Sequence, residues 1–271
     1  MTASDAQWRP HRCALPGAGE VDLWQFDLDA VPASAATLLE PGERRRADAF
    51  ASAALRHHAI ASRASLRVTL AAYLGIDAHE VRFAAENTGK PLLAHAHAHA
   101  SALQFNLAHS AGRALIAVAN RARVGVDIEG IRPLPDMDLI VTRYFGRHER
   151  ACLEALDAGP ARLRAFFGIW TRKEAFLKAT GEGLSRADTF ARHDVAPDPA
   201  RRRWSLTDAD SPAPSRWTLQ MVAVSPHHAA CVALEGDRLA VRMRARQEDT
   251  MVDGAIPVPE AGPPGLPRGE L

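Results

Sequence analysis

The sequence predicts an α+β protein made of two similar halves, each with a small antiparallel sheet packed on a long helix. A long segment with helical periodicity occurs twice, at residues 47–74 and at 162–180. Each is followed by short alternating or apolar segments that are typical of strands. The order of elements therefore repeats, although no sequence repeat accompanies it. With 271 residues, the chain can bury a sizeable core in one large domain or two small ones.

The first half is expected at residues 21–130, after an irregular lead-in over 1–20. Alternation at 21–26 predicts a strand, and the apolar spacing of 47–74 predicts a helix that ends at Gly75. Further strands are expected at 81–83, 105–110, 114–119 and 124–129. Only a short polar stretch separates the last two, so we expect them to pair as a β-hairpin.

The second half is expected at residues 131–236, because the prolines of 131–135 break the preceding pattern. Helices are predicted at 139–144, 147–156 and 162–180, and strands at 204–206, 218–224 and 229–234. The extension 237–271 ends in a tail rich in proline and glycine. Such a tail is expected to be disordered, because it cannot bury enough apolar surface to become ordered.

Composition excludes several classes of protein. A net charge of +1 argues against a nucleic-acid binder that works through a broad basic surface. The three cysteines are widely spaced, which favours reduced thiols over a metal or redox pair. No segment approaches the roughly 18 apolar residues of a membrane span, and the N-terminus lacks a secretory signal. We therefore expect a cytoplasmic protein that binds neither nucleic acid nor a membrane.

Lysines and paired acids mark the candidate site. Only three of the 33 basic residues are lysines, and an ammonium retained against a bias for arginine suggests a site that needs it: Lys90, Lys173 and Lys178. Asp127 and Glu129 lie two residues apart on a predicted strand, so their side chains point to one face. Magnesium would relieve their repulsion and typically uses such carboxylates together with phosphate oxygens. A solvated strand face with two ordinary acids is the alternative.

Glu174 is an acid in an unusual place. It falls within the apolar stripe of the helix predicted at 162–180, which is formed by Leu163, Phe166, Phe167, Trp170 and Leu177. A buried unpaired carboxylate is costly, so this position indicates a cation, a metal or a catalytic role. Lys178 follows one turn later, and a simple helix ion pair worth about 0.2–0.5 kcal/mol is the alternative.

Two motifs carry a family resemblance. Gly125-Val126-Asp127-Ile128-Glu129 is followed downstream by Trp170-x-x-Lys173-Glu174-Ala175-Phe176-x-Lys178 and by Gly181-Glu182-Gly183-Leu184-Ser185. With these motifs the chain resembles the 4′-phosphopantetheinyl transferases, of the larger surfactin-synthetase-activating (Sfp) type. Shorter runs extend the likeness over residues 21–234: Gly89-Lys90-Pro91, Phe105-Asn106-Leu107-Ala108-His109-Ser110, and Arg143-Tyr144-Phe145 with Glu149.

The resemblance implies a pseudo-twofold protein that binds coenzyme A between its halves. The family moves the phosphopantetheine arm onto a serine of an apo acyl or peptidyl carrier protein and releases adenosine 3′,5′-bisphosphate. By motif match, Asp127, Glu129 and Glu174 would hold Mg²⁺ against the pyrophosphate, with Glu174 also the base for the serine hydroxyl. Lys178 would neutralise or protonate the departing phosphate, as phosphoryl transfer requires.

Further contacts to coenzyme A are implied by the same resemblance. Lys90 would lie by the adenine and His109 by the 3′-phosphate, while Arg46, in a run of three arginines, would contact a phosphate. The alternatives are a structural histidine at a strand end and solvated arginines at a helix start.

A run of three histidines could bind a transition metal or could be a loop insertion: His95, His97 and His99. Proteins of this type usually act as monomers.

Two other functions are compatible with these residues. One is a different metal-dependent phosphotransferase that uses a nucleotide. The other is a non-catalytic module that docks carrier proteins. The second has no use for three converging acids, so the set formed by Asp127, Glu129, Glu174 and Lys178 argues against it.

Overall fold

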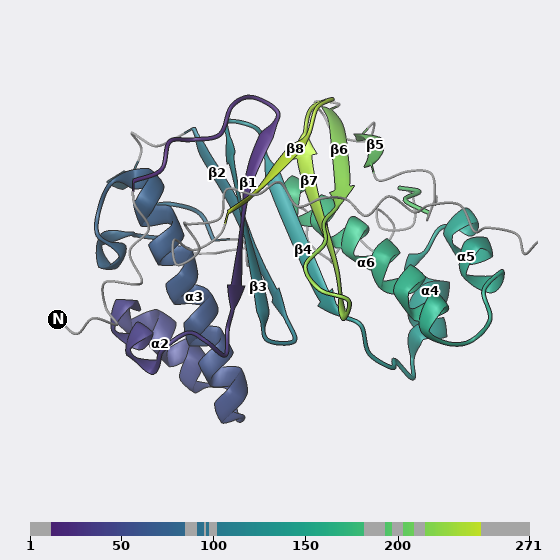
Figure 1. Ribbon diagram of the computed structural model, residues 1–271, viewed down its shortest axis with the longest axis horizontal. Coiled ribbons are helices and arrows are strands. Elements are labelled where there is room, and N and C mark those ends of the chain that lie inside the picture. Colours follow the sequence, from purple (N-terminus) through teal and green to yellow (C-terminus); the bar gives the residue numbers. More distant parts are fainter. Residues whose placement is uncertain are drawn as a thin grey trace, which may run out of the picture.

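The computed structural model describes residues 12–84, 91–94, 96–97, 102–181, 193–196, 203–208 and 215–244. Lys90, His95, His99, residues 182–185 of the second motif and the proline-rich tail lie outside the described residues. Two sheets meet in the middle of the molecule, and helices cover their outer faces (Figure 1). The predicted α+β fold class is confirmed. Among the described residues, no helix combines the length and apolar character needed to cross a membrane.

The first half begins with a strand and contains one dominant helix. Its elements are β1 (Glu20–Asp27), the 3₁₀ helix η1 (Ala33–Leu38), α2 (Pro41–Asp48), α3 (Ala53–Leu74), the 3₁₀ helix η2 (Ala78–Glu80), β2 (Leu103–Ser110) and β3 (Arg113–Asn120). The helix predicted at 47–74 is thus two helices, because the chain is extended at Ser52, the N-cap of α3. As predicted, α3 ends at Gly75, whose φ of 70° suits a glycine cap.

The second half repeats this plan around another long helix. Its elements are β4 (Val124–Gly130), α4 (Met137–Tyr144), α5 (Arg147–Glu154), α6 (Pro160–Thr180), β5 (Arg203–Asp208), β6 (Ser215–Met221) and β7 (His228–Glu235). A last strand, β8 (Ala240–Arg244), was not predicted. All three predicted helices are present, and α6 begins with Pro160, which suits a first helical turn.

The two halves share a strand topology. The first sheet has the order β2-β3-β1-β8 and the second β4-β7-β6-β5. In each half a strand, β1 or β4, precedes the long helix, and two later strands lie beside it in the sheet, β3 and β2 or β7 and β6. The order β2-β3-β1 therefore corresponds to β6-β7-β4. This correspondence is the repeated element order that the sequence predicted.

A buried ion pair recurs at corresponding places in both halves. Glu43 on α2 accepts a hydrogen bond from the N-cap amide of its own helix and pairs at 2.8 Å with Arg67 on α3. Glu149 on α5 likewise accepts from its N-cap amide and pairs at 2.9 Å with Lys173 on α6. In each half, one carboxylate thus caps a short helix and fixes it to the long one.

The hairpin predicted from β3 to β4 is wrong. β3 lies between β2 and β1, whereas β4 pairs with β7 in the other sheet and places Asp127 opposite Cys231. Both strands are buried on both faces, so their apolar sequences do not specify a pairing partner. The hairpin in this region joins β2 and β3, through Ala111 and Gly112 at φ of 46° and 77°.

Three apolar layers hold the elements together. The first lies between α3 and the first sheet, and includes Leu66 and Leu70. The second joins the two sheets, and contains Val126 and Ile128 of β4. The third lies between the second sheet and α6 and is built around large aromatic side chains, among them Phe166. The layers run helix, sheet, sheet, helix across the molecule (Figure 1).

β8 returns from the second half to complete the first sheet. It runs parallel to β1 and brings two arginines to Asp22, which is fully buried. Asp22 accepts hydrogen bonds from Arg242 Nε at 2.9 Å, from Arg244 Nη2 at 3.1 Å and from the Tyr73 hydroxyl at 2.7 Å. The extension predicted at 237–271 thus contributes a strand to the first sheet, while β4 contributes to the second. The domain boundaries given above remain predictions.

We expect the double variant Arg242→Ala, Arg244→Ala to lose about 3–5 kcal/mol of unfolding free energy, because it leaves the buried carboxylate of Asp22 without a cationic partner. Urea unfolding measures this loss. Adding Asp22→Asn should recover part of it, since a neutral amide needs less compensation. Arg216→Ala, at an exposed ion pair of 3.5 Å, should cost no more than about 1 kcal/mol. A double variant as stable as this control would contradict the account.

Candidate active site

β4 and α6 approach each other so closely at Gly125 that no side chain fits between them. A Cβ atom added to Gly125 would lie 2.0 Å from the carbonyl oxygen of Ala175 and 2.5 Å from the amide nitrogen of Ala179. Glycine is therefore required here for packing. Glu174 and Lys178 directly precede these two alanines, and the acids of β4 follow Gly125. The contact thus brings the two sequence motifs together.

The acids of β4 face α6, as their spacing predicts. Val126 and Ile128 pack into the layer between the sheets, so Asp127 and Glu129 lie on the opposite face of the strand. Asp127 is only 3% exposed, whereas the side chain of Glu129 is 25% exposed. The interpretation as an ordinary solvated strand face is therefore wrong for Asp127.

Lys178 reaches from α6 across to the strand. Its Nζ lies 2.6 Å from Asp127 Oδ1, within charge-assisted hydrogen-bond distance. The Lys178 side chain is 33% exposed, whereas its partner is buried. A direct ion pair thus joins the helix motif to the strand motif. Sequence spacing alone suggested only a pair between Glu174 and Lys178 within the helix.

Two carboxylate oxygens in this group have no hydrogen-bond partner among the described residues. They are Asp127 Oδ2 and Glu174 Oε1, both buried. Glu174 is 9% exposed and lies among apolar neighbours, as its place in the stripe predicted. An unsatisfied buried oxygen calls for an explanation, and for these two acids a bound cation would supply it.

The acids also affect one another electrostatically. Burial raises the pKa of Asp127 to about 7, against the effect of Lys178, and the charges of Glu174 and Glu129 add to the rise. Burial likewise raises the pKa of Glu174, with Glu129 contributing in the same direction. The three carboxylates are therefore close enough to repel one another.

A hard divalent cation fits this donor set. The two unsatisfied oxygens are of the type that Mg²⁺ prefers, and Mg²⁺ commonly takes one or two carboxylates together with substrate phosphates. Within the part of the chain that the structure describes, no group of three or more His, Cys, Asp or Glu side chains is placed so that it could hold a metal ion by itself. A metal at these acids would therefore need further ligands, such as the phosphate oxygens that Mg²⁺ commonly takes.

Side chains of β2 hold β4 from the other half of the molecule. Asn106 Oδ1 accepts a hydrogen bond from the Val126 amide at 2.9 Å, and Ser110 Oγ accepts one from the Gly130 amide at 3.2 Å. Ser110 Oγ also donates to Glu129 Oε2 at 2.9 Å. The two donor amides are four residues apart on β4, and the two accepting side chains are four residues apart on β2. The strands therefore run side by side, joined by side-chain hydrogen bonds to the backbone of β4.

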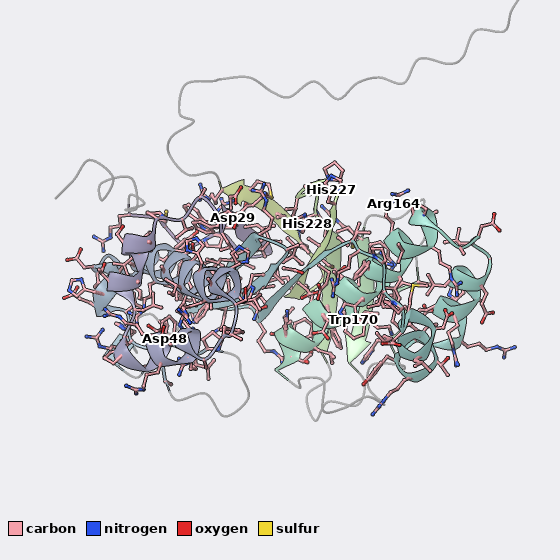
Figure 2. All side chains as sticks on the ribbon, turned by 90° about the horizontal axis from the view of Figure 1, so that it is seen from below. Asp29, Asp48, Arg164, Trp170, His227 and His228 are labelled. Carbon is pink, nitrogen blue, oxygen red and sulfur yellow. The ribbon has the colours of Figure 1, made fainter. Side chains whose placement is uncertain are left out.

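The turn between β2 and β3 touches the second half as well. A Cβ atom on Gly130 would lie 2.6 Å from the Cβ of Ala111, which again leaves room only for glycine. His228 on β7 lies between the two halves, with its Nε2 3.3 Å from the Ala111 carbonyl oxygen (Figure 2). These contacts fix the end of β4 that carries Glu129.

His109 lies within electrostatic reach of the acid group. It is on β2, next to Ser110, and part of the residue is exposed to solvent. Nearby protein atoms that displace water lower the pKa of His109, and the positive charges of Lys178 and His58 lower it further, while Glu129 opposes them. The structure thus brings His109 from the first half to the acids of the second.

The other predicted residues stand apart or lie outside the described residues. Arg46 is exposed on α2, and none of its described contacts leads to the acids. Lys90 is not among the described residues.

Two further residues of the sequence analysis have structural contacts instead. Lys173 is buried against Glu149 and donates to the His193 carbonyl oxygen at 2.8 Å, so this lysine stabilises the packing of the second half. His97 accepts a hydrogen bond from the Arg82 amide at 2.9 Å, which gives it a structural role.

Sequence reasoning assigned no role to Asn106 and Ser110. Both belong to the motif at 105–110, where an amide and a hydroxyl occur in an otherwise mostly apolar strand. Buried polar side chains within a strand need partners, and this was the available signal. The identity of the partners, the amides of Val126 and Gly130, depends on how the two halves meet.

The fold and the site define a two-part α+β protein with an acid and lysine group between its halves. The family model of the 4′-phosphopantetheinyl transferase superfamily matches residues 123–233, and the model described as 4′-phosphopantetheinyl transferase, N-terminal, matches residues 24–121. The two matches together span both halves. They meet at the link between β3 and β4, where the chain passes from one sheet to the other.

Individual relatives agree with the family models. The 4′-phosphopantetheinyl transferase HetI of Nostoc sp. is 35% identical over 196 residues, which is 70% of this chain and 82% of the relative. The human L-aminoadipate-semialdehyde dehydrogenase-phosphopantetheinyl transferase is 26% identical, over 82% of this chain and 77% of the relative. The 4′-phosphopantetheinyl transferase Sfp of Bacillus subtilis is 28% identical, over 55% and 63%. The chain therefore belongs to the 4′-phosphopantetheinyl transferase superfamily and is a transferase enzyme.

We expect Gly125→Ala to destabilise the protein by several kcal/mol and to reduce transfer activity, because the new methyl group would force β4 away from α6. Gly168→Ala on α6 is the matched control. Its methyl group would meet only Arg172 at 3.8 Å, so alanine should be neutral or stabilise the helix by up to about 1 kcal/mol. Thermal unfolding of both variants tests the difference, and equal stability of the two would contradict the packing constraint.

Asp127 should make the metal-free protein less stable as pH rises. Its pKa is about 7 in the folded protein and 3.8 as an ordinary group, so the folded state holds the proton more tightly. The resulting stability is fully present below the ordinary pKa and is lost as pH rises through about 7. Urea unfolding in chelator at about pH 5 and about pH 8 should show a larger loss for the wild type than for Asp127→Asn. Equal losses would contradict this account.

Proposed function

We propose that this enzyme transfers the 4′-phosphopantetheine group of coenzyme A to a serine of an apo acyl or peptidyl carrier protein and releases adenosine 3′,5′-bisphosphate. One observation carries the proposal: buried, incompletely satisfied acids meet a lysine within the region that matches the superfamily. Of the three functions compatible with the sequence, membership in this superfamily favours the transferase.

The acid group supplies ligands for a metal. We propose Mg²⁺ at this site, held by Asp127, Glu129 and Glu174, and the unsatisfied oxygens of Asp127 and Glu174 support the choice. When bound, Mg²⁺ would neutralise charge on the pyrophosphate of coenzyme A. Ser110 orients Glu129 through its hydrogen bond, and Gly125 sets the distance between strand and helix.

Two residues of α6 are suited to the proton and charge changes of the reaction. The carrier serine oxygen forms a bond to the phosphorus that bears the pantetheine arm, and the bond from that phosphorus to the bridging oxygen breaks. Glu174 would take the hydroxyl proton, and its raised pKa makes it a stronger base than an exposed carboxylate. Lys178 would neutralise or protonate the departing phosphate of adenosine 3′,5′-bisphosphate.

We propose that Arg46, Lys90 and His109 contact coenzyme A, together with Asp127 and Lys178. His109 is supported by its electrostatic proximity to Lys178 and Glu129, from which a 3′-phosphate contact could extend the binding surface into the first half. The proposals for Arg46 and Lys90 rest on their motif positions alone.

We also propose that the enzyme is of the Sfp type. Two family models in tandem on one chain and the likeness to the Bacillus subtilis Sfp support this. Because one chain supplies both halves of the site, the enzyme needs no second copy, and we propose a monomer. We propose a cytoplasmic location, no nucleic-acid or membrane partner, and two functional halves that meet between β3 and β4, because β4 belongs to the second sheet although the sequence placed it within residues 21–130.

The transfer is tested by incubating the protein with coenzyme A, Mg²⁺ and a panel of apo carrier proteins. The mass gain of one phosphopantetheine arm on a carrier is the expected result. No mass gain on any carrier of the panel would defeat the proposed function. Coenzyme A should also raise the unfolding temperature of the protein more than a nucleoside triphosphate does, because only the former is expected to bind the folded state specifically.

Glu174→Gln should lower the transfer rate by about 10²–10⁴-fold, the usual contribution of a general base, because the amide cannot accept the serine proton. The amide has nearly the same volume, so the unfolding temperature should not fall. Glu154→Gln, an exposed position at the end of α5, is the control and should transfer at the wild-type rate. Near-normal turnover of Glu174→Gln would disprove its role as the base.

A further inference from the structure

Lys178 pairs with one of the two Asp127 oxygens that a metal could use. Its ammonium lies 2.6 Å from Asp127 Oδ1, and the carboxylate is only 3% exposed. A cation at this distance lies where an ion bound to the same oxygen would compete with it. A third of the Lys178 side chain is exposed to solvent, so a ligand in solution can reach it. Asp127 is buried on β4, which Gly125 and Asn106 hold in place.

One lysine does not satisfy the acids around it. Asp127 Oδ2 and Glu174 Oε1 are buried and find no hydrogen-bond partner within the described part of the chain, although Asp127 Oδ1 is paired. Both residues are at least nine-tenths buried, at 3% and 9% exposed. A metal ion can bind oxygens of several carboxylates at once, whereas the Lys178 ammonium pairs with only one oxygen of Asp127 here. The acids are therefore better satisfied by a metal ion than by the lysine alone.

We propose that Lys178 is an internal counter-cation that weakens metal binding until coenzyme A draws the ammonium away from Asp127. This inference rests on the proposed function. The phosphates of coenzyme A attract the Lys178 ammonium, and its departure frees Asp127 Oδ1 for the metal. Coenzyme A and the metal therefore bind cooperatively, and each raises the affinity for the other by the same factor. The partly exposed lysine is the element that couples the two ligands.

The pairing of Lys178 with Asp127 also stabilises the metal-free enzyme. Three carboxylates without any cation would repel one another in a buried setting, at a large cost in stability. Lys178 lowers that cost in the metal-free protein. The same residue then serves the departing phosphate after it has moved, so one side chain stabilises both the resting protein and the reacting complex.

The test measures Mn²⁺ binding by electron paramagnetic resonance, which reports the free ion and needs no turnover. Lys178→Met removes the charge and keeps most of the volume. Without coenzyme A, this variant should bind Mn²⁺ about tenfold more tightly than the wild type, within the usual range of coupling between sites. With coenzyme A present, the wild type should gain more affinity for Mn²⁺ than the variant gains.

Two further variants control for charge and folding. Arg132→Met removes a positive charge 3.6 Å from Glu129, where the arginine is 58% exposed, and should change Mn²⁺ affinity far less. Lys178→Gln provides a second neutral side chain, and circular dichroism and thermal unfolding establish that each variant is folded. Equal or weaker Mn²⁺ binding by both folded Lys178 variants, relative to the wild type, would overturn the proposal.

This outcome is distinct from failure of the proposed function. Mn²⁺ binding without coenzyme A tests the displacement of Lys178 alone, whereas the carrier panel tests the transfer. A protein that transfers no arm, but whose Lys178 variants bind Mn²⁺ more tightly, would retain the counter-cation and lose the proposed function. A protein that transfers the arm, but whose variants bind Mn²⁺ no better, would retain the function and lose the counter-cation.

Discussion

The contact between β4 and α6 at Gly125 is the constraint on which the site depends. A side chain at this position would overlap the helix backbone at Ala175, so the strand and the helix can approach only through glycine. Their separation sets how far Asp127 lies from Lys178 and Glu174. Acids that are distant in sequence thereby share one buried space, where their mutual repulsion and the need for a cation follow from the packing.

Joining of the two halves is the second requirement. β2 and β4 are edge strands of different sheets, and Asn106 and Ser110 satisfy amides of β4 that a pairing strand would otherwise occupy. β8 crosses back in the other direction and pairs with β1, where Asp22 receives its arginines. Each half thus completes part of the other, which is why residues of both, such as His109 and Glu129, meet at one site.

The acids of the site lie in surroundings that do not fully satisfy them. Glu174 interrupts an apolar stripe, and Asp127 is buried with one oxygen unsatisfied. Two buried acids of the scaffold, Glu43 and Glu149, are by contrast paired with basic side chains and backbone amides. Polar groups that conflict with local packing are expected where ligands bind.

The sequence by itself determined the periodic elements, the shared face of Asp127 and Glu129, and the misplaced acid Glu174, because these depend on spacing within one helix or strand. The motifs also determined the family. Only the tertiary structure decided that β4 pairs with β7, that β8 returns to the first sheet, and that Lys178 reaches Asp127. Strand partners and cross-element ion pairs depend on contacts between distant residues, and an apolar strand buried on both faces specifies no partner.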